Sequence, residues 1–140
     1  MQLSDYRKEI SEIAAGVDPL LNGYPTIPAV VHAPAVVVAP AAKPTARFDV
    51  TMGLGTARWY FDIMVLTPFN EMDSGQELLD SYIDPNSSSS ITAALMYNHT
   101  LNGTVDDSRV IEISNYGGKF ENANVQHIGA IINFEVFPAC

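Results

Sequence analysis

The carboxyl-terminal part of the chain carries the strongest constraint on its fold, a long alternation of apolar and other side chains. Apolar residues occupy every second position from Ile128 to Val136, with residues such as Asn133 and Glu135 between them. Because successive side chains of a strand point to opposite faces of a sheet, this period of two predicts a strand over residues 125–137. One face is expected to pack on helices and the other to meet water or a neighbouring subunit.

Two further alternating runs predict a β-hairpin in the middle of the chain. The first run starts at Arg47, and the second ends before Pro68, which cannot donate a hydrogen bond to a sheet. A loop with two glycines, residues 53–57, joins them and is expected to project flexibly. The apolar positions that share a face are Phe48, Val50, Met52, Trp59, Phe61, Ile63 and Val65. Residues 108–115 predict one more strand.

Apolar residues at helical spacing predict helices over about residues 4–17 and 74–83, and a short third helix that starts near Ile91. Ser74 and Glu77 form a capping box for the second helix, whose acidic residues are expected on its exposed side. The serine run before Ile91 is expected to cap the third helix.

The segment 18–46 holds six of the nine prolines. Its short β-branched runs at 29–32 and 35–38 are bounded by prolines, which are tolerated at strand ends and sheet edges. We expect extended pieces at a sheet edge, and a free proline-rich linker is the alternative. Residues 1–140 are therefore expected to form one α+β domain. It has a four- or five-stranded, mostly antiparallel sheet with helices packed on one face.

Charge is scarce and unevenly distributed in this chain. Charged residues make up 16%, below the roughly 25% of typical soluble domains, and apolar residues make up 47%. A buried subunit contact explains this balance, and so does the Ala- and Val-rich stretch. The net charge of −9 argues against a free-standing nucleic-acid binder. The segment between Arg58 and Arg109 carries all but one unit of this net negative charge. It forms either a solvated face or a surface that repels DNA or docks a basic partner.

The sequence does not group residues in the way that catalysis or metal binding requires. His32, His99 and His127 are far apart, with His99 expected in a loop and His127 partly exposed on a strand. Cys140 is the only cysteine and ends the chain, so no internal disulfide is predicted, as is usual in a reducing compartment. Asp106 and Asp107 are expected to cap or solvate a turn. We therefore predict no enzymatic activity, no cofactor and no metal site.

No apolar run approaches the roughly 20 residues that span a membrane, and the first residues lack a secretory signal layout. We therefore expect no membrane partner.

Four stretches, taken in order, resemble tail terminator proteins of long-tailed actinobacterial phages. They read FDVTMGLGTARWYFDIMVLTPFN, then ELLDSYIDP with a serine-rich link into ITAAL, then TVDDSRVIEISNYG, and finally HIGAIINFEVF. The resemblance runs from the first helix to about Phe137. It rests on a succession of weak signatures and not on a single diagnostic motif.

This resemblance implies a structural virion protein that forms a ring, commonly a homohexamer, at the head-proximal end of the tail. Such a ring caps the tail tube protein and joins it to the head connector, and genome DNA passes through without specific binding. The resemblance also implies synthesis in the cytoplasm of the bacterial host and carries over no catalytic residue. Alternatives are another neck or tail subunit, such as a head-closure or tube protein, or a small ligand-binding or enzymatic α+β domain.

Candidate interface residues follow from loop, edge and charge. The first candidates are the hairpin tip, Gly53, Leu54, Gly55, Thr56 and Ala57, with Arg58 beside it, and the scarce cations Arg47, Arg58 and Arg109. The acidic surface comprises Glu71, Asp73, Glu77, Asp80 and Asp84. The proline-rich segment 28–38 is a candidate for strand addition or lateral contact. The three arginines are expected to meet a neighbour's acids, and pairing within the chain is the alternative.

Overall fold

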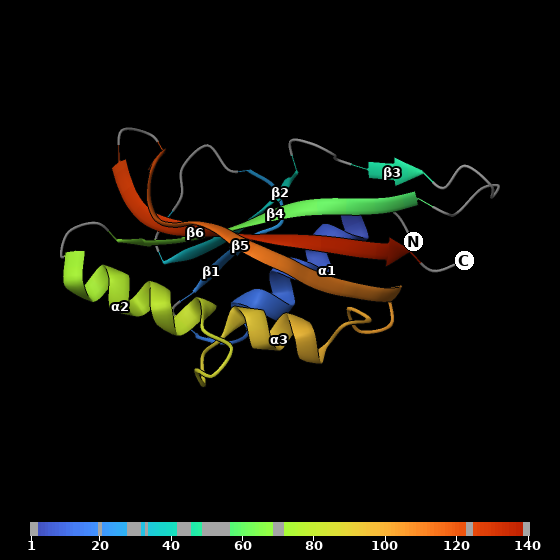
Figure 1. Cartoon of the computed structure of the whole chain (residues 1–140), viewed down its shortest axis with the longest axis horizontal. Helices are drawn as coiled ribbons and strands as arrows, with labels where there is room; N and C mark the ends of the chain where they lie inside the picture. The colour runs from blue at the N-terminus through green and yellow to red at the C-terminus, as the bar shows by residue number, and fades with distance from the viewer. Residues whose placement is uncertain are drawn as a thin grey trace.

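Three helices cover one face of a single sheet (Figure 1). The computed structural model describes residues 3–19, 21–27, 32, 34–41, 46–48, 57–68, 72–122 and 125–138. The elements are α1 (Leu3–Ala15), β1 (Asn22–Tyr24), β2 (Ala35–Pro40), β3 (Ala46–Phe48), β4 (Ala57–Pro68), α2 (Met72–Ile83), α3 (Ile91–Tyr97), β5 (Val105–Asn122) and β6 (Val125–Pro138). The strand order is β1-β2-β4-β6-β5, with β3 also paired to β4. The α+β class, the mostly antiparallel sheet and the one-sided helix layer are confirmed.

The two alternating runs recognised in the sequence lie side by side as β4 and β6. Their antiparallel register pairs Phe61 with Phe134 and Ile63 with Ile132. Since cross-strand partners share a face, both apolar sets reach the helix layer together. β4 also pairs with β2 and β3, whereas the pairing of β1 with β2 is parallel.

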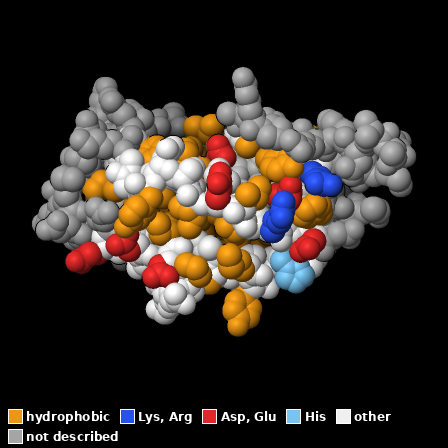
Figure 2. All heavy atoms as spheres, viewed as in Figure 1, with side chains coloured by type: hydrophobic (Ala, Val, Ile, Leu, Met, Phe, Trp, Pro, Cys, Tyr) orange, Lys and Arg blue, Asp and Glu red, His pale blue; other side chains and the backbone are white. Residues whose placement is uncertain are grey.

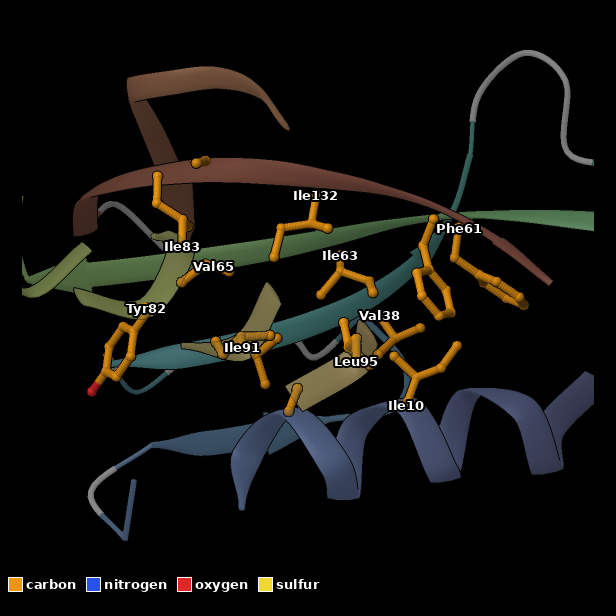
Figure 3. Packing of buried hydrophobic residues seen from close by; sticks show 14 of the residues in the cluster. Ile10, Val38, Phe61, Ile63, Val65, Tyr82, Ile83, Ile91, Leu95 and Ile132 are labelled. Carbon is orange, nitrogen blue, oxygen red and sulfur yellow. The ribbon is translucent and has the colours of Figure 1, made fainter. Parts of the chain in front are cut away.

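The main core lies between this face and the helices, and side chains from both layers point toward each other (Figure 3). The helices contribute Tyr6, Ile10, Ala14, Leu79, Tyr82, Ile91 and Leu95. The hydroxyl of Tyr82 donates a 2.9 Å hydrogen bond to Oδ2 of Asp18. Burial, and then this carboxylate, raises the pKa of Tyr82 far above its usual value, so the phenol stays protonated and keeps donating.

The helix boundaries confirm one cap and correct another. Ser90 precedes α3, and its side chain accepts a 3.0 Å hydrogen bond from the backbone N–H of Ala93, as predicted. α2 begins at Met72, two residues before Ser74, so the predicted capping box at Ser74 is wrong. A capping pattern in sequence marks a possible start, but other residues can begin the helix earlier.

The expectation that residues 35–38 lie at a sheet edge is wrong. β2 pairs with β4 along its length, and its residues 35–37 also pair with β1. Val36 and Val38 enter the main core, while Ala35 and Val37 are buried on the opposite face. Because both faces are covered, the run is continuously apolar, which also rules out the linker alternative here. Residues 29–31 lie outside the described residues.

β5 is longer than the predicted strand over 108–115. It covers 18 residues, and its pairing with β6 shifts register at three places. In the largest shift, Asn115, Tyr116 and Gly117 lie between the paired residues Ser114 and Gly118. Asn115 and Gly117 both have positive φ values, 52° and 73°. Such a bulge breaks the period of two, so the sequence pattern stops there while the strand continues.

Candidate functional site

The predicted hairpin exists, and it places two arginines opposite each other. Arg47 of β3 and Arg58 of β4 are cross-strand partners. The guanidinium carbon of Arg58 lies 5.6 Å from the centroid of the Phe137 ring, within the range of a cation–π contact. Ala57 is the first residue of β4 and not part of the loop, and residues 53–56 lie outside the described residues. We call Arg47 and Arg58 the arginine pair.

Arg109 is paired within the chain, as the alternative interpretation held. Its Nε donates a 2.7 Å hydrogen bond to Oε1 of Glu135, its cross-strand partner. The Glu135 side chain is 2% exposed, whereas that of Arg109 is 62% exposed. The buried carboxylate of Glu135 therefore binds Nε of Arg109, while most of the Arg109 side chain is exposed.

The acidic residues lie along and after α2. Glu77 and Asp84 are exposed, and Asp84 accepts a 3.0 Å hydrogen bond from the backbone N–H of Asn86. Asp80 accepts a hydrogen bond from the hydroxyl of Tyr116 in the β5 bulge. Asp73 lies within α2, and Glu71 lies outside the described residues. The bulge is thus tied to α2 through one of the candidate acids.

Large apolar side chains are also exposed on α3 and β5, and the sequence-based candidates did not include them. Met96 and Tyr97 of α3 are 50% and 91% exposed, and Ile111 and Tyr116 of β5 are 45% and 52% exposed. Ile111 lies at a register shift, which takes it off the buried face. Hydrophobic and acidic side chains are interspersed on this side of the molecule (Figure 2). Because α2 and α3 are in contact, we name Glu77, Asp80, Asp84, Met96 and Tyr97 together the acidic–apolar surface.

The face of the sheet opposite the helices carries a polar row across three strands. Asp62 of β4 pairs with Asn133 of β6, and Asn133 pairs with Glu112 of β5. Nδ2 of Asn133 donates to Oε1 of Glu112 at 3.1 Å and to Oγ of Ser114 at 3.3 Å. Burial raises the pKa of Asp62 above its usual value. The side-chain amide of Asn133 therefore links β6 to β5 through two hydrogen bonds.

Beside this row the end of the β5–β6 hairpin folds onto a second, smaller apolar cluster. Phe120 packs against buried Ala35, Val37 and Leu66. Gly129 lies beneath this contact. A Cβ placed there would come within 2.9 Å of Cδ2 of Phe120 and 2.8 Å of Cδ2 of Leu66.

His127, the cross-strand partner of Phe120, is 2% exposed, so its predicted partial exposure is wrong. Within the described part of the chain, neither ring nitrogen has a hydrogen-bond partner. Burial lowers the pKa of His127 below its usual value, because no partner offsets the loss of water around the charged form.

Replacing His127 with leucine is expected to flatten the pH dependence of stability. As the pH falls below about 6.5, the unfolded chain binds a proton that the buried imidazole resists, so the free energy of unfolding falls. His127→Leu removes this loss, and it should match or exceed wild-type stability near neutrality because an unpaired buried polar group costs about 1–3 kcal/mol. Urea unfolding at about pH 8 and about pH 5 measures both effects, with His32→Leu as an exposed-histidine control. Parallel curves for wild type and His127→Leu would contradict the assignment.

Of the candidate residues that the sequence offered, His99 and Asp107 lie next to each other. His99, in the turn after α3, has Nδ1 2.9 Å from Oδ1 of Asp107, and both side chains are more than half exposed. No group of three His, Cys, Asp or Glu among the described residues is arranged to hold a metal ion. None of the described helices is long and apolar enough to cross a membrane. No protein-family model and no curated protein sequence matches this chain.

Proposed function

We propose that this chain is a structural subunit that assembles into a ring at the head–tail junction of a bacteriophage, as a tail terminator protein. The observation that carries self-assembly is the exposure of Tyr97 at 91%, next to exposed Met96, on a chain with few charged residues. Aromatic residues and methionine are enriched at protein interfaces, and contiguous exposed apolar area on a soluble domain marks an interaction site. The resemblance to tail terminator proteins supplies the kind of assembly.

A ring accounts for the acidity as well. Repeated head-to-tail contacts use two different patches on each subunit, and each contact needs about 1,000 Å² or more of buried surface to persist. DNA that passes through a ring must not be retained by it. A subunit of net charge −9 gives the ring an overall negative field, which disfavours the phosphate contacts that would hold the DNA.

Native mass spectrometry and negative-stain imaging test this proposal, with purified protein alone and with isolated tail tubes. We expect closed rings at high protein concentration or at one end of the tubes. Binding at the tube end separates a terminator from a tube subunit, which would extend the tube instead. A protein that stays monomeric and never binds tube ends would contradict the proposal.

Substituting Tyr97 with serine is expected to weaken ring formation about tenfold or more, because an exposed aromatic at an interface contributes 2 kcal/mol or more when it is a hot spot. Ile27→Ser is the matched control, since Ile27 is 64% exposed but follows β1 at the opposite edge of the sheet. Sedimentation velocity of both variants measures the change. If the two variants assembled equally well, the acidic–apolar surface would not be part of the subunit interface.

A further inference from the structure

β5 forms the long outer edge of the described sheet (Figure 1). It covers 18 residues, whereas β1 at the other end of the strand order covers three. An edge strand presents backbone N–H and C=O groups that can pair with a strand of another molecule. Because the same strand would then meet itself, β5 of a second copy would pair with this edge across a two-fold axis.

The beginning of β5 is attached to the turn after α3. Oδ1 of Asp107 accepts a 2.9 Å hydrogen bond from the backbone N–H of Ser108 and lies 2.9 Å from Nδ1 of His99. The hydroxyl of Ser108 donates a 2.7 Å hydrogen bond to the backbone oxygen of His99. One backbone N–H of β5 is therefore taken up by a side chain and is not available to a second strand.

A bulge interrupts the second half of β5. Residues 115–117, which we call the β5 bulge, lie opposite a single residue of β6, Ala130. Asn115 and Gly117 have positive φ values, 52° and 73°, so the backbone leaves the extended conformation twice within three residues. Bulges are a common protection of sheet edges, because a second strand cannot follow the bend with regular hydrogen bonds.

The β5 bulge is fixed to the helix layer by one of its own side chains. The hydroxyl of Tyr116 donates a hydrogen bond to Oδ1 of Asp80 in α2. Tyr116 is 52% exposed, so burial alone does not hold it in place. Exposed Arg109 and Glu112 add charge to the part of the strand before the bulge, which also disfavours the pairing of edges.

We infer that the β5 bulge, fixed on α2 through Tyr116 and Asp80, blocks the pairing of β5 with β5 of a second copy. Such a pair would use the same patch on both subunits and close as a dimer, whereas the proposed ring needs two different patches. The bulge thus closes a competing route of association and restricts assembly to surfaces formed by exposed side chains. This block goes beyond the proposed ring and does not depend on it.

A variant that straightens β5 tests the block. It lacks Tyr116 and Gly117 and carries Asn115→Val. One residue then lies opposite Ala130, a core position that suits valine, and the pairing with β6 runs without a shift over residues 112–122. We expect dimerisation to strengthen about tenfold or more, since the net contribution of one or two hydrogen bonds across the new edge already amounts to that factor. Sedimentation velocity below the concentration of ring formation measures this change.

Hydrogen exchange locates the new contact and reports on folding. The backbone amides of β5 should gain protection in the dimer of the straightened variant, while those of β4 and β6 keep the protection that they have in wild type. If the folded variant dimerises no more tightly than wild type, or if the protection appears on α3 instead of β5, the block is wrong.

Tyr116→Phe tests the fixation without altering the length of the chain. It removes the hydroxyl that binds Asp80, and we expect dimerisation to become about threefold tighter because the bulge is held less firmly. Tyr97→Phe is the matched control, since it removes the hydroxyl of the 91% exposed tyrosine on α3 and should leave dimerisation unchanged. If the straightened variant does not fold, equal dimerisation of these two single variants overturns the inference.

The block and the ring fail separately. If wild type never forms rings, in solution or on tail tubes, the proposed function is wrong, while a tighter dimer of the straightened variant still supports the block. If wild type forms rings and the straightened variant forms them equally well without dimers, the ring stands and the block is wrong.

Discussion

Adding one methyl group at Gly129 is expected to lower the free energy of unfolding by about 3 kcal/mol. A Cβ at this position would lie 2.5 Å from the backbone oxygen of Val65, a separation that real Cβ atoms do not reach. The side chains of Leu66 and Phe120 close the space from the other side. Because the nearest atom belongs to the backbone of β4, the strands must move apart to relieve the clash.

Urea unfolding followed by the fluorescence of Trp59, the only tryptophan, measures this cost. Gly103→Ala is the control, since Gly103 has a φ of 84° and an added Cβ there would meet nothing within 4 Å, so it reports backbone strain of about 1 kcal/mol without a clash. Adding Phe120→Ala to Gly129→Ala should not recover the loss, because the Val65 oxygen remains. A cost at Gly129 no larger than at Gly103 would contradict the close packing.

The parts of the fold that the sequence predicted are those in which a local pattern and a tertiary contact agree. The apolar alternation of β6 predicted its core-facing side correctly, because the apolar residues at every second position from Ile128 to Val136 all lie in the main core. The other side of β6 is more buried than predicted, since His127, Gly129 and Glu135 are buried as well. Ser90 caps α3 because the cap needs only residues within one turn. The prolines at the ends of β2 predict an edge strand. The position of β2 within the sheet, however, is set by its pairing with β4 and β1, which the local sequence of β2 does not reveal.

The candidate site was predictable in composition but not in geometry. The acidic segment follows from the sequence, and Glu77 and Asp84 are indeed exposed. Met96 and Tyr97 follow buried Leu95 directly, off the buried stripe of α3, so the helical period carries a local signal for their exposure. No local sequence signal indicated the pairing of Arg109 with Glu135, because the register of β5 on β6 depends on shifts that no local pattern reveals.

Removing the side chain of Arg109 is expected to lower the free energy of unfolding by about 2 kcal/mol, because a hydrogen bond to a charged group contributes roughly 1.5–3 kcal/mol. The larger part of this cost arises at Glu135, whose side chain is 2% exposed and would lose its arginine partner. Arg109→Lys should recover only part of the loss, since an ammonium does not reproduce the Nε geometry.

A double-mutant cycle with Glu135→Gln separates this pair from assembly. Glutamine removes the buried charge, so Arg109→Ala should cost about 1 kcal/mol less in the Glu135→Gln chain than in wild type. Because Arg109 is held within its own subunit, Arg109→Ala should leave the dissociation constant between subunits within about twofold wherever the protein is folded. A larger change in association than in stability would show that the outward surface of Arg109 meets a neighbour's acids.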